Sequence, residues 1–246
     1  MPRFFIDAPL ETRDLLALPD GVVRHVQVLR LQTGDSITLF NGEGGEFSAE
    51  LVEIERRSVR VKIGEFRPVD VEPPYRITLA QGVAGGDKMD WLIEKAVELG
   101  ASAFVPLTTA RSVVRLSGER AARRQAHWQG IVSASCEQCG RNRLPSVAPA
   151  ADLPGWLDSM PAQPLDGELR LLLSPRASIE FAALPTEPPK DLVTLLIGPE
   201  GGLSADEEAA ALGHGFTGIG LGPRVLRTET AGIAILAALA ARWGGW

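Results

Sequence analysis

The stretch Leu195-Leu-Ile-Gly-Pro-Glu-Gly-Gly-Leu-Ser204 runs from an apolar strand candidate into a turn rich in glycine and proline. A second stretch of the same kind follows at Leu221-Gly-Pro-Arg-Val-Leu-Arg-Thr-Glu-Thr-Ala231. Each turn leaves backbone uncovered beside a few polar side chains, which suits a pocket lined by main chain better than a core. These two turns are therefore the starting point for predicting both the fold and the function of the chain.

Around the two turns, short apolar runs alternate with helical periodicity. The candidate strands are 76–80, 103–107, 169–173, 192–197 and 216–220. Between the first two, Asp87 can cap a helix that Gly100 ends, and Ser204 with Glu207 forms a capping box for another. The alternation predicts an α/β fold with a mostly parallel sheet covered on both faces. A final helix, from about Thr230 to Arg242, is apolar almost all round, so it must be buried in the core or against a second subunit.

The N-terminal part has a different pattern. Polar and apolar residues alternate over 36–40, 46–54 and 58–63, with Asn41–Gly45 as a turn, which predicts a half-exposed antiparallel sheet. Pro73 and Pro74 then interrupt the chain. We therefore expect a small β-domain over 1–72 and an α/β domain over 73–246.

Composition narrows the classes of protein that the chain can belong to. Of its 246 residues, 45% are hydrophobic, enough to furnish real cores in an ordinary globular protein. The longest apolar run, 231–241, falls well short of the ~20 residues that a membrane-spanning helix needs. The first residues lack the apolar core of a secretion signal. We therefore expect a cytoplasmic protein that does not bind membranes.

The distribution of charge is uneven. The net charge is −6, yet residues 76–145 hold ten Lys and Arg against six Asp and Glu. Seven of these bases are arginines between Arg111 and Arg143, and arginine suits phosphates and base edges better than lysine. The segment is either a local cationic surface or the solvated face of a helix, and the sequence alone does not separate the two.

Several familiar sites are excluded. The chain contains no Gly-Lys pair, so it has no P-loop, and the elbow Gly-x-Ser-x-Gly of serine hydrolases is absent. Gly218-Ile-Gly-Leu-Gly222 is followed at once by Pro223, and too little chain remains for a dinucleotide fold. Cys136 and Cys139 could form a redox pair or half of a zinc site, but no second pair exists and the histidines lack ligand spacing. We expect two reduced thiols and no metal.

The two turns resemble the C-terminal signature of the SPOUT, or α/β-knot, RNA methyltransferases. Among these the chain is most similar to the 16S ribosomal RNA uridine N3-methyltransferase family. Further matches are Arg24-His-Val-Gln-Val-Leu-Arg30 before Gly34-Asp35, the run 88–100, Arg111-Ser-Val-Val114 and Cys136-Glu-Gln-Cys-Gly-Arg141. The resemblance implies a PUA-like RNA-binding domain, a trefoil-knot domain that holds S-adenosylmethionine, and a homodimer that modifies 16S rRNA within the small ribosomal subunit.

The resemblance also suggests roles for individual residues. The cofactor-binding set is Leu173, Gly198, Pro199, Glu200, Gly201, Leu221, Gly222, Val225, Leu226 and Thr230, the alternative being tight turns without a ligand. Because uridine N3 must lose a proton, we expect Arg227 to face the ring oxygens and Glu200 or Glu229 to accept the proton if burial raises its pKa. Water or a phosphate could accept it instead. Arg227 and Glu229 could also pair with each other, or with carbonyl groups of the loop, simply to hold the knot.

The expected RNA contacts come from both domains. They are Arg3, Arg24, His25, Arg30, Lys88, Arg111, Arg115 and Arg141, although Lys88 and Arg141 could equally form ion pairs that support the fold. Because N3 lies on the pairing edge, the target uridine must be exposed or flipped out. The alternatives are another SPOUT enzyme, such as a ribose 2′-O-methyltransferase, and an RNA-binding assembly factor without the chemistry.

Overall fold

The computed structural model describes residues 1–245, which form two compact units. The first unit contains Met1–Val71 and Ser133–Leu144, and the second contains Glu72–Val132 and the chain from Pro145 onward. The predicted domains, 1–72 and 73–246, differ from these units at Glu72, which lies in the second unit, and by the segment Ser133–Leu144, which lies in the first. The last residue of the predicted second domain, Trp246, lies outside the described residues.

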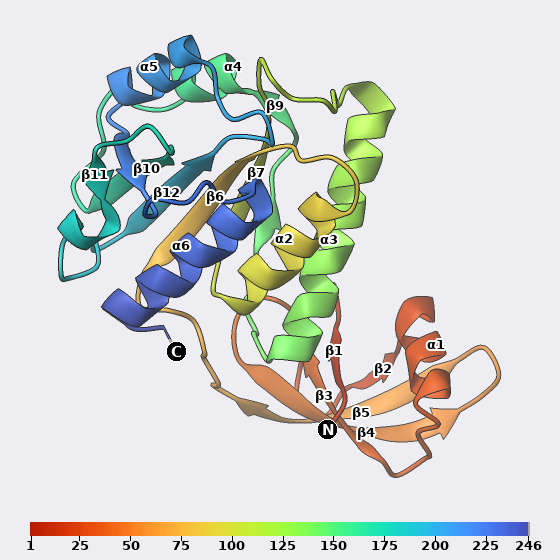
Figure 1. Cartoon of the computed structure of the whole chain (residues 1–246). Helices are drawn as coiled ribbons and strands as arrows, with labels where there is room; N and C mark the ends of the chain where they lie inside the picture. Colours follow the sequence, from red (N-terminus) through yellow and green to blue (C-terminus); the bar gives the residue numbers. More distant parts are fainter. Residues whose placement is uncertain (246) are drawn as a thin grey trace. The chain divides into compact units, whose positions relative to one another are not determined.

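The first unit is built on a five-stranded sheet in the order β1-β3-β4-β5-β2 (Figure 1). All its pairings are antiparallel except that of β1 with β3. Its elements are β1 (Arg3–Phe5), β2 (Leu15–Ala17), α1 (Asp20–Val28), β3 (Ser36–Phe40), β4 (Glu46–Ile54) and β5 (Val59–Arg67). Alternate residues such as Ile37, Leu51 and Val61 are fully buried, so one face of the sheet makes the core.

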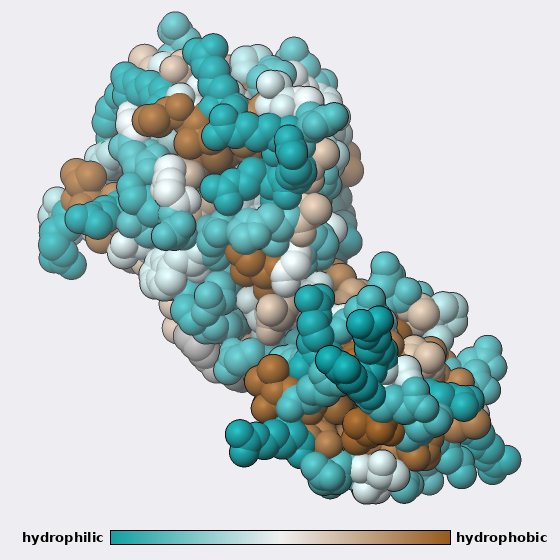
Figure 2. Space-filling view, turned by 90° about the vertical axis from the view of Figure 1, so that its right-hand side faces the viewer, coloured by the Kyte–Doolittle hydropathy of each residue, from teal (hydrophilic) through white to brown (hydrophobic). Residues whose placement is uncertain are grey.

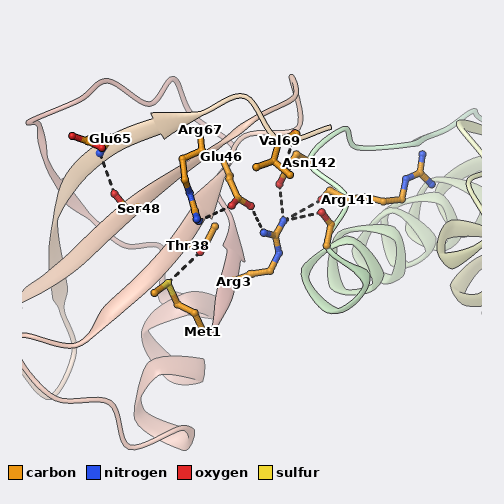
Figure 3. Close-up of polar contacts among 11 residues, drawn as sticks. Met1, Arg3, Thr38, Glu46, Ser48, Glu65, Arg67, Val69, Arg141 and Asn142 are labelled. Atoms are coloured by element: carbon orange, nitrogen blue, oxygen red, sulfur yellow. Dashed lines mark hydrogen bonds and ion pairs between the residues drawn. The ribbon is translucent and has the colours of Figure 1, made fainter. Parts of the chain in front are cut away.

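Side-chain hydrogen bonds join β1 to the segment 133–144 within this unit. Arg3 forms an ion pair with Glu46 and donates to Asn142 Oδ1 at 2.6 Å (Figure 3). The amide of Phe5 donates to Glu137 Oε1 at 2.9 Å. The bonds from Arg3 and Phe5 to this segment connect residues more than 130 positions apart, which explains why the end of α3 (Gly118–Cys139) belongs to the N-terminal unit.

The second unit contains an eight-stranded sheet in which every described pairing is parallel. The order is β11-β13-β10-β12-β6-β7-β8, with β9 beside β7. The strands are β6 (Arg76–Gly82), β7 (Ala103–Thr108), β8 (Ser146–Val147), β9 (Ala151–Asp152), β10 (Glu168–Leu173), β11 (Ile179–Glu180), β12 (Leu192–Ile197) and β13 (Thr217–Gly220). The prediction of a mostly parallel sheet is confirmed.

Helices cover both faces of this sheet. On one face, α2 (Lys88–Glu98) and α6 (Thr228–Trp243) lie side by side (Figure 1). Their close approach needs Gly232, where a Cβ would come within 2.7 Å of Leu92 Cδ1. On the other face, Leu196 packs in a cluster with Leu157 and Ala211, which come from α4 (Leu153–Asp158) and α5 (Ala205–Gly213). A 3-10 turn, η1, spans Phe181–Ala183.

The helices begin close to the predicted positions. The capping box of α5 is present, since Ser204 Oγ accepts from Glu207 N at 3.1 Å and Glu207 Oε2 accepts from Ser204 N at 2.8 Å. Asp87 occupies the cap position of α2, but its side chain makes no capping bond because its backbone (φ −85°, ψ 2°) is not extended. Helix α6 begins at Thr228, two residues before the predicted start.

Two further expectations concern the state of the cysteines and the absence of a membrane-spanning helix. Cys136 and Cys139 are both free thiols, as predicted, and Cys136 is buried. Within residues 1–245, no helix is long and apolar enough to span a bilayer.

Candidate functional site

The two glycine-rich turns, which follow β12 and β13, line a cavity of about 580 Å³ in the second unit. The cavity lies at the carboxyl ends of β10, β12 and β13, which are neighbours in the parallel sheet, and this is where open α/β sheets bind ligands. Of the residues predicted to hold a cofactor, those lining it are Leu173, Gly198, Pro199, Glu200, Gly201, Leu221, Gly222, Val225 and Leu226. Thr230 is exposed in the first turn of α6 and does not line it.

Close backbone packing shapes one wall of this cavity. A Cβ on Gly198 would lie 2.8 Å from both the carbonyl carbon of Gly202 and the amide nitrogen of Leu203. A Cβ on Gly82 would meet the ring of Pro199 at 2.5 Å. Both distances are shorter than real side chains allow, so the main chain itself forms the wall and a ligand can approach it closely.

Glu200 is held by donors at the entrance to the cavity. Its Oε1 accepts from Lys88 Nζ at 2.8 Å and from the amide of Gly85 at 2.9 Å. Burial acts to raise the pKa of Glu200, but the hydrogen bonds from Lys88 and from the amides of Glu200 and Gly85 outweigh it, so the pKa lies below its ordinary value. A pKa raised by burial, the condition under which Glu200 could accept the proton, is therefore not met, because these donors act in the opposite direction.

The other two candidate catalytic residues lie at the start of α6. Glu229 lines the cavity, and its Oε2 is buried without a hydrogen-bond partner among the described residues. Arg227 also lines the cavity, is exposed, and forms no ion pair with any residue of 1–245. The alternative in which Arg227 and Glu229 pair with each other is therefore not seen in the described chain. Both groups are available to a ligand.

Other charged side chains around the cavity were not predicted from the sequence. Glu208 Oε1 accepts from Ser174 Oγ at 3.0 Å and pairs with Arg176 at 2.7 Å. Arg224 lines the cavity on the same loop as Arg227. Nothing in the sequence marked Arg176 or Glu208, because they become neighbours only through the pairing of β10 with β12 and β13.

The residues predicted to contact RNA fall into different environments. Arg24 and His25 are exposed on α1, and Arg30 is exposed just after it with a left-handed φ of 54°. Val28 and Leu29, at the end of this helix, are exposed apolar residues. This helix end therefore offers cationic and apolar groups together. Figure 2 shows that hydrophobic and hydrophilic residues lie side by side on the surface in the lower part of its view.

The remaining predicted RNA contacts are more constrained. Arg3 is engaged by Glu46 and Asn142 within its unit, and Lys88 is paired with Glu200. Arg141 is only 4% exposed, so it does not form part of an open cationic surface. Arg111 lines the cavity and donates to Gly201 O at 2.9 Å, and Arg115 is exposed. The seven arginines between Arg111 and Arg143 are thus divided between the two units. Some of their side chains are exposed, whereas others are buried or hydrogen-bonded within the chain.

Gln81 and Thr228 are functional candidates that sequence reasoning missed. Gln81 is fully buried at the end of β6, where it donates to Thr228 Oγ1 at 2.8 Å. The one available signal was a glutamine near the end of a mostly apolar strand, directly before a glycine.

Comparison with known proteins agrees with this geometry. A family model described as an RNA methyltransferase domain matches residues 71–240, and one described as an RNA methyltransferase PUA domain matches residues 18–64. The fold, the cavity and these matches define the chain as an RNA methyltransferase with an N-terminal PUA domain.

Individual relatives of known name show which family of RNA methyltransferases the chain belongs to. Ribosomal RNA small subunit methyltransferase E of Bacillus subtilis is 33% identical over 97% of this chain and 96% of its own length. The protein of the same name from Buchnera aphidicola subsp. Schizaphis graminum is 32% identical over 99% and 97%. A crystal structure of that enzyme from Neisseria gonorrhoeae, bound to S-adenosyl methionine, covers 99% of this chain and 98% of its own, with 38% identity and a TM-score of 0.91. The chain belongs to the ribosomal RNA small subunit methyltransferase E family.

Proposed function

We propose that this chain transfers a methyl group from S-adenosylmethionine to N3 of a uridine in the 16S RNA of the small ribosomal subunit. The observation that carries the proposal is the cavity between the turns that follow β12 and β13, lined by glycine-rich main chain with Arg227 and Glu229 at its side. The membership of the chain in its family gives the RNA as the acceptor.

The cavity fits the methyl donor. Its volume lies in the range of small-molecule sites, roughly 300–1,000 Å³, and its lining combines apolar Leu173, Ile197 and Leu226 with open backbone. The unpartnered Oε2 of Glu229 is an acceptor that no group of the described chain uses, so the lining offers polar contacts as well as apolar ones. S-adenosylmethionine, when bound, supplies an activated methyl group on a sulfonium.

The chemistry needs no covalent intermediate on the protein, so positioning dominates. Methylation at N3 requires that the N3 proton leaves, and the negative charge then spreads over the two ring carbonyl oxygens. Arg227 is exposed beside the cavity and unpaired within the described chain, so its guanidinium can face those oxygens and stabilise the charge. We therefore propose Arg227 as the electrostatic catalyst.

The two glutamates are suited to different tasks. The pKa of Glu200 lies below its ordinary value because of its donors, so it stays a carboxylate and its ion pair with Lys88 orders the turn. Glu229 has a free buried oxygen and stands two residues from Arg227. We propose Glu229, rather than Glu200, as the side chain that accepts the proton, either directly or through water.

The proposal extends to partners and location. The predicted SPOUT knot, the homodimer and the two predicted domains belong to it, as does action in the cytoplasm, where ribosomal subunits of bacteria are assembled. The homodimer is supported by Trp91 of α2, which is 44% exposed, and by apolar residues of α6 that are only partly buried in the chain, such as Ile233 and Ala237. Within residues 1–245, no group of three or more His, Cys, Asp or Glu side chains is arranged to hold a metal ion.

A reconstituted reaction tests the function. The purified chain, S-adenosylmethionine and small ribosomal subunits from a strain that lacks this enzyme are incubated, and the RNA nucleosides are analysed by mass spectrometry. We expect new N3-methyluridine. A new 2′-O-methylnucleoside would instead support the ribose methyltransferase alternative, and an inert protein that does not bind the cofactor would support an assembly factor.

A further inference from the structure

Gln81 and Thr228 form a buried hydrogen-bonded link directly behind the cavity wall. Gln81 Nε2 donates to Thr228 Oγ1 at 2.8 Å, to Gly82 O at 2.8 Å and to Gly198 O at 3.2 Å. The hydroxyl of Thr228 in turn donates to Gly198 O at 2.6 Å. Gln81 is 0% exposed and Thr228 is 7% exposed, so water does not compete for these bonds.

This link joins three segments that are far apart in sequence. Gln81 lies near the end of β6, Gly198 begins the turn after β12, and Thr228 begins α6. The residues on either side of Gly198 and Thr228 that line the cavity include Pro199, Arg227 and Glu229. The two walls of the cavity are therefore joined in two ways. The Thr228 hydroxyl bonds directly to Gly198 O, and the amide of Gln81, which does not itself line the cavity, bonds to both partners.

The link is directional. All hydrogen bonds of the Gln81 side chain pass through Nε2, while its Oε1 is buried without a partner among the described residues. A buried acceptor left without a donor is unfavourable, so this position would be better filled by an apolar side chain if packing alone mattered. The amide group at position 81 therefore serves the three oxygens that it contacts.

We propose that Gln81 is a positioning residue, which sets the affinity of the cavity for S-adenosylmethionine and the placement of Arg227 by holding Gly198 and Thr228 together. The inference rests on the proposed function. Without the amide donor, only the bond from the Thr228 hydroxyl to Gly198 O still joins the turn to the start of α6, and the two walls separate more freely. Binding of RNA to other parts of the chain does not depend on this link.

The direct test is Gln81→Met, which keeps the length of the side chain and removes the donor. We expect the Kd for S-adenosylmethionine, measured by calorimetry, to rise about tenfold, while the Kd for RNA stays within about twofold of wild type. Gln81→Glu should weaken binding more, because it places a carboxylate against the carbonyl oxygens of Gly82 and Gly198, which cannot donate. Thr194→Val is the control, since Thr194 is also buried in the sheet, on β12, but lies outside the cavity lining.

A double-mutant cycle with Thr228→Val shows whether the two side chains act as a unit. We expect Gln81→Met to add little when Thr228→Val is already present, whereas independent contributions would multiply. Far-UV circular dichroism and thermal unfolding establish that each variant is folded at the temperature of the titration. Thr228→Ser, which keeps the hydroxyl, should bind with nearly wild-type affinity.

The outcomes separate the inference from the function that underlies it. Wild-type affinity in folded Gln81→Met, equal losses in Gln81→Met and Thr194→Val, or full additivity in the cycle would each overturn the positioning role. If the wild-type chain itself fails to bind S-adenosylmethionine, the proposed function fails instead.

Discussion

The substitution Gly198→Ala probes the backbone wall of the cavity. Its Cβ would lie 2.8 Å from the carbonyl carbon of Gly202 and the amide nitrogen of Leu203, whereas ordinary contact begins at 3.4 Å. The main chain of 202–203 must therefore move by about 0.6 Å. Two hydrogen bonds hold this segment against such a movement, because Gly202 N donates to Pro199 O at 2.8 Å and the side chain of Ser204 caps α5.

This overlap sets the size of the expected effect. Overpacking of this kind typically costs about 1–3 kcal/mol of stability. Because the displaced atoms form the wall, we also expect the Kd for S-adenosylmethionine to rise by about tenfold or more. Calorimetric titration and chemical denaturation measure the two quantities.

A second glycine provides the matched control. Gly130 lies inside α3, and nothing is within 4 Å of the position its Cβ would occupy. Gly130→Ala should stabilise the helix by up to about 1 kcal/mol and leave the affinity unchanged. If Gly198→Ala binds S-adenosylmethionine as tightly as Gly130→Ala does and is equally stable, the wall does not form the cofactor site.

Three further outcomes are expected. Arg227→Ala should lower kcat by a factor of about 10²–10³, which is the usual effect of removing one donor to a developing negative charge. The Kd for S-adenosylmethionine should not change. A turnover rate near that of the wild type would refute the catalytic role of Arg227. Alanine at both Arg111 and Arg115 should weaken RNA binding and reduce the slope of log K against log salt by roughly 0.7–0.9 for each phosphate that is no longer neutralised. The control Arg60→Ala, in which the lost side chain is paired with Glu53, should change the slope less. Equal slopes in the wild type, the double variant and Arg60→Ala would mean that Arg111 and Arg115 do not contact RNA. Tyr75, the sole tyrosine of the chain, is buried with its ring 5.5 Å from that of Trp243, and burial raises its pKa to about 12. Its absorbance titration should therefore have its midpoint there. Because the unfolded phenol ionises near 10, its contribution to stability should be complete below pH 10 and be lost as the pH rises toward 12; a midpoint near 10 in the folded protein would contradict this burial.

Local patterns predicted much of the fold. The strands over 36–40, 46–54 and 192–197 have the predicted bounds, because strict alternation or a continuous β-branched and leucine-rich run leaves little choice of structure. The capping box at Ser204 needs only residues three positions apart. The cavity was predictable for a similar reason, since the parallel strands of one sheet bring the turns that follow them to the same edge.

What the sequence did not indicate depends on distant contacts. The lowered pKa of Glu200 arises from Lys88, 112 positions away, and the burial of Gln81 against Thr228 spans 147. Local periodicity does not show that Ser133–Leu144 joins the N-terminal unit, because its partners are Arg3 and Phe5. Polar side chains in particular gain their roles from such partners, so their identity alone does not separate an RNA contact from a structural bond.

The most direct test of the proposed function is nucleoside mass spectrometry of small-subunit RNA from cells that lack the gene for this chain. We predict that one N3-methyluridine is lost, that the wild-type chain restores it, and that a folded Arg227→Ala chain does not. An unchanged set of modified nucleosides in the deletion strain would contradict the proposed function.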